Sequence, residues 1–121
     1  MDCIFCKIIN GDIPSYTIYE NEYVKCFLDI NPIGKAHTLI VPKKHYVDIN
    51  DIELDVLTKV NEAAKEVVKM INDIFKPSGV KLLQNNGCLQ EVKHYHLHII
   101  PEYKGKQNKI SVEEVYKKLT K

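Results

Sequence analysis

The residues with the clearest chemical potential lie in one short stretch, His94-Tyr95-His96-Leu97-His98-Ile99-Ile100-Pro101. Three of the five histidines alternate there with apolar or aromatic residues, and alternation with a period of two is typical of a β-strand. The pattern therefore predicts a strand over 94–101 with all three imidazoles on one face. Imidazole has no special preference for strands, but its charge changes near physiological pH. Three in register indicate a nucleophile, a phosphate-binding cluster or a metal site.

The rest of the chain predicts the elements that must position this strand. Strands are predicted over 16–20, 23–28, 36–42, 80–84 and 94–101, and helices over 3–10, 52–76 and 111–118. In the long helix, apolar residues recur every three or four positions and charged residues take the opposite face. Ser111-Val112-Glu113-Glu114 is a capping box that begins the last helix. The order of these elements indicates an α+β fold, a five-stranded antiparallel sheet with helices packed on it.

Length and charge limit the possible functions. The chain has 121 residues, enough for one domain with a core of its own, and a net charge of +1. That charge does not suggest a nucleic acid polymer or a membrane surface as a partner. Residues 1–10 carry Asp2 and Lys7 and lack the long apolar stretch of a secretory signal. We therefore expect a cytoplasmic protein whose four cysteines are reduced.

The motif His-X-His-X-His with apolar X resembles the signature of the histidine triad (HIT) superfamily. Other motifs fall where that family places them: Phe27-Leu28-Asp29-Ile30-Asn31-Pro32, His37 at the start of a strand, Pro42-Lys43-Lys44-His45, Asn85-Asn86-Gly87 and Gln90-Glu91-Val92. The resemblance covers nearly the whole chain and implies a single HIT domain over residues 1–121. It also implies a homodimer.

The resemblance further implies cleavage at the α-phosphorus of a nucleoside phosphate derivative, with a purine nucleotide such as an AMP derivative as substrate. By the family pattern His96 is the nucleophile, and its attack would form a nucleotidyl-histidine that water hydrolyses. His98 would hydrogen-bond the phosphate oxygens or the leaving-group bridge. His94 would stand behind His96 and hold its ring and tautomer. His96 and His98 are therefore expected to contact the nucleotide as well as to act in catalysis.

The same resemblance assigns the rest of the nucleotide site. Asp29 would accept hydrogen bonds from the two ribose hydroxyls. Phe27 and Ile30 would line the base pocket, although from the residues alone core packing is the better interpretation. Asn85 and Gln90 would offer amide donors to the phosphate.

The chain departs from the family pattern in two places. The loop that leads to Gln90 is shorter than usual and lacks an Ala-Gly pair, and Glu91 stands where many relatives carry serine or threonine. A carboxylate there would repel a phosphate unless it points away or meets a cation such as Lys93.

Cys3-X-X-Cys6 has three interpretations. A thioredoxin-like redox motif needs a preceding strand, for which there is no room. Two buried apolar cysteines are the second alternative. The third is half of a structural zinc site, with His45 and His94 as the other half. This pattern resembles the one in some bacterial HIT proteins and in the related galactose phosphate uridylyltransferases. Cys26 and Cys88 have no partner in this scheme and are predicted to be packing residues.

Three functions follow from this reading. The first is a nucleotidyl hydrolase without a catalytic cofactor, acting on phosphoramidates like Hint-type members or on dinucleoside polyphosphates like Fhit-type members. The second is a nucleotide-binding regulatory module with vestigial catalysis. The third, a metalloenzyme that uses the three strand histidines as ligands, is disfavoured because positions i and i+4 of a strand lie too far apart to share one ion.

Overall fold

The computed structural model describes residues 3–121 of the chain; Met1 and Asp2, part of the N-terminal stretch considered above, lie outside it. The elements run in the order α1 (Ile4–Ile9), β1 (Thr17–Glu20), β2 (Val24–Leu28), β3 (Thr38–Pro42), α2 (Leu54–Phe75), β4 (Gly79–Leu83), a 3₁₀ turn (Gly87–Leu89), β5 (Leu97–Glu102) and α3 (Val112–Leu119). Every predicted helix and strand is present, with ends shifted by at most three residues.

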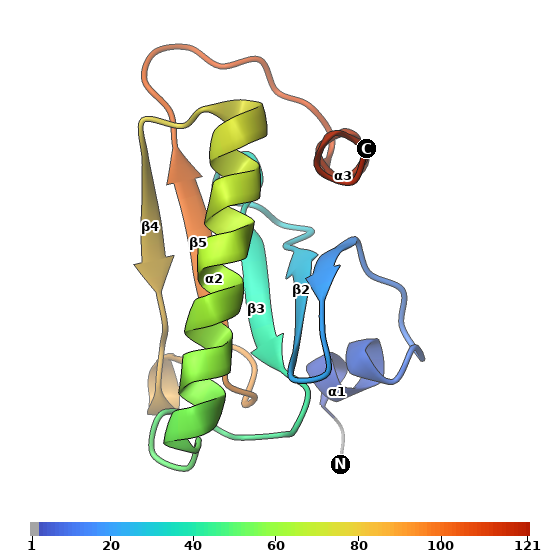
Figure 1. The fold of residues 1–121 in the computed structure, drawn as a ribbon, viewed down its shortest axis with the longest axis vertical. Helices are drawn as coiled ribbons and strands as arrows, with labels where there is room; N and C mark the ends of the chain where they lie inside the picture. The colour runs from blue at the N-terminus through green and yellow to red at the C-terminus, as the bar shows by residue number, and fades with distance from the viewer. Residues whose placement is uncertain (1–2) are drawn as a thin grey trace.

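The five strands form one antiparallel sheet in the order β1-β2-β3-β5-β4 (Figure 1). The α+β prediction of a five-stranded antiparallel sheet with one long and two short helices is therefore confirmed. The order places β5 beside the central strand β3, and β4 and β1 form the two edges. Since β4 precedes β5 in the chain, the last strand is inserted between β3 and β4.

The helices cover the two faces of the sheet unequally. The apolar stripe of α2 packs on the face that presents alternate residues of β2, β3 and β5, and α3 adds Val115 and Leu119 to the same core. The opposite face carries a smaller cluster, to which α1 contributes Cys3, Phe5 and Ile8 and the strands contribute Phe27, Leu39 and Val41. In Figure 1, α2 crosses in front of the sheet and α1 lies apart at its lower right.

The helix ends follow the local signals. Ser111 caps α3, because its hydroxyl accepts a hydrogen bond from the backbone N–H of Glu114, as the capping-box motif predicts. The helix α2 ends at Phe75; the next residue, Lys76, adopts the left-handed conformation and is followed by Pro77, which cannot continue a helix. Among the helices of residues 3–121, none has both the length and the apolar character needed to cross a bilayer.

Candidate functional site

The triad segment enters the sheet later than its alternation predicts. The prediction of a strand over 94–101 is wrong at its start, because β5 begins at Leu97 and only His98 of the three histidines lies in the ladder. There His98 faces Leu39 of β3 and Leu83 of β4. The edge strand β4 ends at Leu83, opposite His98, so within residues 3–121 β5 has no strand partner on that side before His98. On the other side the pairing with β3 stops at Ile40 and Leu97, although β3 itself runs on to Pro42.

Residues before the strand are held by other contacts. The backbone N–H of Tyr95 donates to the carbonyl of Tyr46 at 2.7 Å, which keeps the chain extended beyond the end of the sheet. The rings of His96 and His98 still lie on the same side, with centroids 4.8 Å apart. The three histidines are therefore gathered, but by a combination of one ladder position and local backbone contacts.

The His96 ring has a defined orientation. Its Nδ1 lies 2.7 Å from the backbone carbonyl of His94, and a carbonyl only accepts, so Nδ1 carries the proton and donates. The other ring nitrogen, Nε2, is left with its lone pair. Burial lowers the pKa of His96, which keeps the ring neutral at neutral pH. A neutral imidazole with a free Nε2 is a competent nucleophile.

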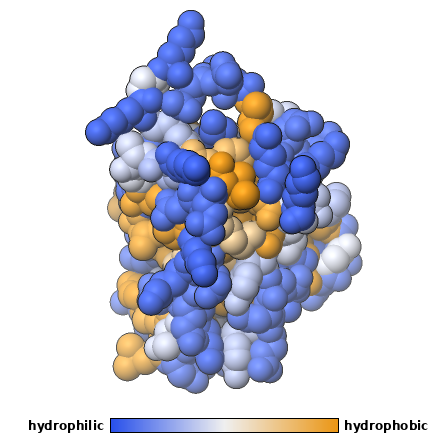
Figure 2. Space-filling view, turned by 45° about the horizontal axis from the view of Figure 1, so that its top comes forward, coloured by the Kyte–Doolittle hydropathy of each residue, from blue (hydrophilic) through white to orange (hydrophobic). Residues whose placement is uncertain are grey.

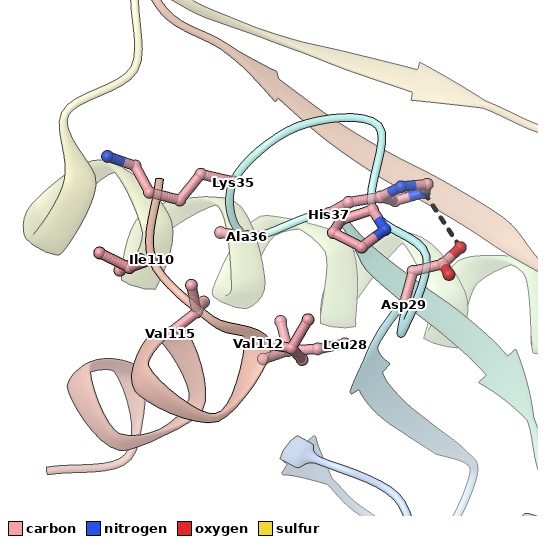
Figure 3. A pocket seen from close by; sticks show the side chains of 9 residues that line it. Leu28, Asp29, Lys35, Ala36, His37, Ile110, Val112 and Val115 are labelled. Atoms are coloured by element: carbon pink, nitrogen blue, oxygen red, sulfur yellow. Dashed lines mark ion pairs between the residues drawn. The ribbon is translucent and has the colours of Figure 1, made fainter. Parts of the chain in front are cut away.

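On the other side of His98 stands His37, which begins the segment leading into β3. His37 Nε2 lies 3.0 Å from His98 Nδ1 and 3.7 Å from the Asp29 carboxylate. Figure 3 shows the Asp29 side chain directed at the His37 ring, with apolar side chains of the C-terminal segment on the far side. Burial lowers the pKa of both imidazoles, that of His98 to about 4. The structure thus brings Asp29 and two histidines together across three elements of the fold.

A second group combines the residues that the sequence analysis named as metal ligands. The ligand atoms of Cys3, Cys6, His45 and His94 all lie within 4.8 Å of one another. His94 Nδ1 is 3.4 Å from Cys3 Sγ and 3.6 Å from Cys6 Sγ, and His45 Nδ1 is 3.3 Å from Cys6 Sγ. A tetrahedral zinc ion with nitrogen and sulfur ligands requires separations of roughly 3.3 to 3.8 Å between them.

The surroundings of His94 also fit a metal. Its Nε2 lies 2.8 Å from the carbonyl of Pro42 and must donate to it, so Nδ1 is left unprotonated towards the two thiols. The side chain is fully buried, and burial lowers the pKa of His94 to about 4. A histidine held as a neutral base with its second nitrogen on a carbonyl is the usual arrangement of a zinc ligand. The donor set and its geometry therefore fit a closed Cys2His2 centre.

The residues expected around the base and ribose lie near the histidines but differ in exposure. Phe27 is buried, points to the same face as His98 and meets the ring of Phe5 edge-on at 5.7 Å. Ile30 is 71 % exposed immediately after Asp29. The Asp29 carboxylate already accepts one hydrogen bond, from the N–H of Asn31 at 2.8 Å. Its remaining acceptor positions are available to a ligand.

The loop that precedes the triad is tied to residues 47–51. The carboxylate of Asp48 accepts from the N–H of Gly87 at 3.2 Å, and the Asn86 side chain accepts from the N–H of Ile49 at 2.8 Å. Gln90 donates its amide N–H to the carbonyl of Val47 at 2.6 Å, and its Oε1 is buried with no partner in the part of the chain that the structure describes. The Gln90 donor is thus directed at this loop, while Asn85 is half-buried beside it.

Predictions were also made for Glu91 and for the two cysteines outside the metal-ligand group, Cys26 and Cys88. Cys88 is exposed, so the prediction that it is a packing residue is wrong; it lies in the 3₁₀ turn, whose residues are not part of the core. Cys26 is fully buried, as predicted. Glu91 is exposed, and Lys93 donates to the carbonyl of Gly87.

Phe5 is a site residue that was not predicted from the sequence. Its ring lies edge-on to His96, with centroids 5.0 Å apart. Its place between Cys3 and Cys6 was the available signal, because a helix that brings those thiols to His94 must also bring its buried face close to the triad. The backbone carbonyls of Pro42 and His94 also orient the histidines. Every residue has such a carbonyl, so the residue types did not predict these two contacts.

Comparison with known proteins identifies the family. The model of the HIT domain matches residues 10–105. This chain belongs to the HIT family. Protein hit of Bacillus subtilis is 45 % identical over 104 residues, which cover 84 % of this chain and 72 % of that protein. Adenosine 5'-monophosphoramidase HNT1 of Candida albicans is 42 % identical over 106 residues, 83 % of this chain and 70 % of the relative.

Solved structures of HIT proteins show the same fold. A zinc-bound histidine triad family protein from Mycobacterium smegmatis superposes with a TM-score of 0.90 at 31 % identity, over 99 % of this chain and 91 % of the other. A HIT-like protein from Bartonella henselae gives a TM-score of 0.89 at 34 % identity, over 98 % and 95 % of the two chains. The HIT family membership that the sequence motifs suggested is confirmed.

Proposed function

We propose that this HIT protein is a nucleotide hydrolase that cleaves the phosphorus–nitrogen bond of an adenosine phosphoramidate. The observation that carries the proposal is the orientation of His96, whose Nδ1–H is held by the His94 carbonyl at 2.7 Å. Attack by the Nε2 lone pair would form a bond to the α-phosphorus as the bond to the amine breaks. Water would then hydrolyse the nucleotidyl-histidine and release AMP.

Glu91 favours a phosphoramidate over a dinucleoside polyphosphate. Burial lowers the pKa of His96, and the negative charge of Glu91 is the smallest of the effects that oppose this shift, so the field of the carboxylate reaches the nucleophile. A polyphosphate chain brings several negative charges to that field, whereas a phosphoramidate monoester brings one. The yeast relatives support this choice, since those of Candida albicans and Saccharomyces cerevisiae, 42 % and 43 % identical, are adenosine 5'-monophosphoramidases by name.

The nucleotide would lie on the face of the sheet that α1 shares. Asp29 would accept the ribose hydroxyls with its unused lone pairs, and His98 would meet a phosphate oxygen. The base would cover the exposed side chain of Ile30, beside Asp29, and remove it from water. The buried Phe27 would form the inner wall of the base pocket. Asn85 and Gln90 complete the set carried over from the family pattern, and His94 supports His96 through its carbonyl.

The Cys3, Cys6, His45 and His94 group would hold a structural zinc ion. Its support is the near-tetrahedral spacing of the ligand atoms and the zinc-bound relative from Mycobacterium smegmatis. Zinc here would supply a fixed anchor between α1 and the triad segment. No catalytic cofactor is required by a mechanism that uses His96 as the nucleophile.

We also propose that the whole chain is one HIT domain that forms a homodimer through β4. The helices α1 and α3 lie outside the matched residues 10–105 but pack on the same sheet. In β4 only Val80 is partly buried, while Leu82 is 52 % exposed. The other edge, β1, is contacted by α3. Figure 2 shows apolar side chains along its left side, the side on which β4 lies in Figure 1. An open apolar edge strand favours pairing with a second copy.

Turnover and binding measured on one variant test the enzymatic proposal. His96→Asn should lower kcat for an adenosine phosphoramidate with a fluorescent amine by roughly 10⁴-fold or more, because it removes the nucleophile. AMP binding by calorimetry should persist. Lys117→Ala, a change on the exposed side of α3, is the control and should leave both values unchanged. Equal turnover by His96→Asn would contradict the mechanism, and a wild-type chain that binds AMP without turnover would support a regulatory module instead.

A further inference from the structure

His37 is a buried ring with both nitrogens engaged. The side chain is 2 % exposed, its Nδ1 lies 3.1 Å from the backbone N–H of Ile33, and its Nε2 lies 3.0 Å from His98 Nδ1. In the sequence, His37 stands at the start of a predicted strand and has no predicted role. Its contacts determine where the protons of this part of the site reside.

A backbone N–H only donates, so the lone pair on His37 Nδ1 must accept from Ile33. The neutral ring then carries its proton on Nε2, which donates to His98 Nδ1. His98 in turn must carry its own proton on Nε2. Burial lowers the pKa of both rings, so both are neutral near pH 7.

His98 therefore has the opposite tautomer to His96. His96 holds its proton on Nδ1 and leaves a lone pair on Nε2, because its partner is the His94 carbonyl. His98 has a lone pair on Nδ1, used by His37, and an N–H at Nε2. Two neighbouring imidazoles thus present a nucleophilic lone pair and a hydrogen-bond donor, although their residue type is the same.

The same contacts argue against a metal ion between Asp29, His37 and His98, whose ligand atoms also lie within 4.8 Å of one another. A metal on His37 Nε2 would move the proton of the neutral ring to Nδ1, where it would face the N–H of Ile33. At His94 the second nitrogen faces a carbonyl, which suits a metal ligand. The group around His37 is accordingly a chain of hydrogen bonds.

The loop that holds the Ile33 N–H is firmly placed. A Cβ atom on Gly34 would lie 2.7 Å from the carbonyl oxygen of Pro101, so the backbone passes β5 at a distance that only glycine allows. The Tyr103 hydroxyl donates to the carbonyl of Lys35 at 2.9 Å. Ala36 adopts φ of 72°, a left-handed conformation that turns the chain just before His37. Strain of this kind persists where the surrounding structure imposes it.

The C-terminal segment completes the enclosure. Ile110, Val112 and Val115 line a small pocket together with Asp29 and His37, and Figure 3 shows these three apolar side chains projecting from the C-terminal segment toward the pocket. Their apolar side chains offer no alternative hydrogen-bond partner to the ring. The N–H of Ile33 therefore sets the tautomer of His37, and the resulting Nε2–H of His37 donates to His98.

We infer that His37 is a positioning residue that fixes the Nε2–H tautomer of His98 and thereby makes His98 a hydrogen-bond donor to the phosphate oxygens of the nucleotide. The inference rests on the proposed function for its use of a phosphate, but the tautomer itself follows from the contacts of the free protein. A donor directed at the phosphorus oxygens stabilises charge that develops during attack by His96.

Two variants at position 37 separate its two hydrogen bonds. In His37→Asn the side-chain oxygen stands near the place of Nδ1 and can accept from Ile33, but the shorter side chain does not reach His98. In His37→Gln the amide N–H extends one bond further, near the place of Nε2, and can still donate to His98. The first therefore cuts the link to His98, and the second preserves it.

The test combines kinetics with long-range proton–nitrogen NMR spectra of the ¹⁵N-labelled full chain. We expect the wild type to show His98 as the Nε2–H tautomer and His96 as the Nδ1–H tautomer. His37→Asn should give His98 signals of exchanging tautomers and lower kcat by about 10- to 100-fold, with KM changed less than about threefold. His37→Gln should retain the wild-type tautomer and a kcat within about threefold of the wild type.

An Nδ1–H tautomer at His98 in the wild type would overturn the inference. This measurement uses the wild-type protein alone, so it does not depend on whether the variants fold. Equal losses of kcat in the two variants would also overturn it, because a purely structural role does not distinguish them. If the wild type shows the expected tautomers but does not turn over the phosphoramidate, the proposed function fails while the role of His37 in setting the tautomer of His98 stands.

Discussion

The ring of Phe5 meets the imidazole of His96 edge-on, with centroids 5.0 Å apart and planes inclined at 77°. Phe5 stands against His94 in the same way, at 5.9 Å. It belongs to α1, whose Cys3 and Cys6 lie on either side of it in the sequence. One aromatic side chain therefore connects the proposed zinc centre to the proposed nucleophile.

Removal of zinc should release α1. The N–H of Asn10 donates to the carbonyl of Cys6, so its exchange with deuterium reports on the helix. With free zinc at 100 times its Kd, we expect this amide to exchange about 100-fold faster after chelation, because bound ligand stabilises the closed state by RT ln(1 + [L]/Kd). Cys3→Ser should lower the zinc content of the purified protein, whereas Cys88→Ser, a change at an exposed cysteine outside the cluster, should not. Equal zinc content in both variants would contradict the assignment.

Asp29→Asn should weaken recognition of the ribose. Asparagine can still accept from the N–H of Asn31, so the turn is preserved while the negative charge is lost. Wild-type protein should bind AMP about 10-fold more tightly than 2',3'-dideoxy-AMP, since hydrogen bonds to charged groups contribute roughly 1.5–3 kcal/mol. The variant should distinguish them by less than about threefold. Calorimetric titration with both ligands measures this, and an unchanged ratio would exclude Asp29 as the ribose acceptor.

The stability of the protein should decrease in mild acid partly because of His98. Burial lowers the pKa of His98 in the folded chain to about 4, from an ordinary value of 6.5. Between these values the unfolded chain binds more protons, so the free energy of unfolding falls as pH is lowered through this range. Urea unfolding between pH 7 and 5 should show a shallower pH dependence for His98→Asn than for the wild type. Parallel curves would show that His98 titrates alike in both states.

A charge on the open edge of the sheet should produce monomers. Leu82→Arg places a cation on β4, where 52 % of the side chain is exposed. Light scattering coupled to size exclusion should then show a mass of 14.0 kDa, against twice that for the wild type. Tyr23→Ser removes an exposed apolar side chain, 42 % exposed, near the opposite edge and serves as the control. A monomeric wild type, or a dimeric Leu82→Arg variant, would contradict pairing through β4.

Neutralising Glu91 should broaden the substrate range. Because the Glu91 charge acts on His96, Glu91→Gln should raise kcat/KM more for a dinucleoside polyphosphate than for a phosphoramidate. The carboxylate is exposed, so the expected gain is modest, about two- to fivefold, and it should shrink at high salt. A loss of activity with both substrates would instead give Glu91 a direct part in the reaction.

The sequence predicted the fold well because its signals are local. The apolar period of residues 54–75 and the capping Ser111 act within one or two turns of helix, and both were found as expected. The predicted metal ligands Cys3, Cys6, His45 and His94 also come together. These groups could be named because their residue types are unusual in the positions they occupy.

The remaining features depend on contacts between distant segments. The start of β5 moved to Leu97 because the edge strand β4 ends at Leu83, opposite His98, and the alternation of 94–98 does not reveal where a partner strand stops. Gln90 donates to Val47, a backbone carbonyl more than forty residues away, and Ile33 N–H sets the tautomer of His37. Nearly every residue carries the same backbone donor and acceptor, so a pattern of side chains does not predict which of these groups will contact the site.

The unequal covering of the sheet has a practical consequence. The face beneath α2 and α3 contains most of the buried apolar residues, whereas the face that carries α1, Phe5 and the histidines has a small cluster. Cooperative unfolding reports the sum of both faces, and most of that sum comes from the face beneath α2 and α3. Local opening of the face that carries α1 needs far fewer contacts to break, so it should precede global unfolding and be detected by amide exchange or by signals of the histidines rather than by a melting curve.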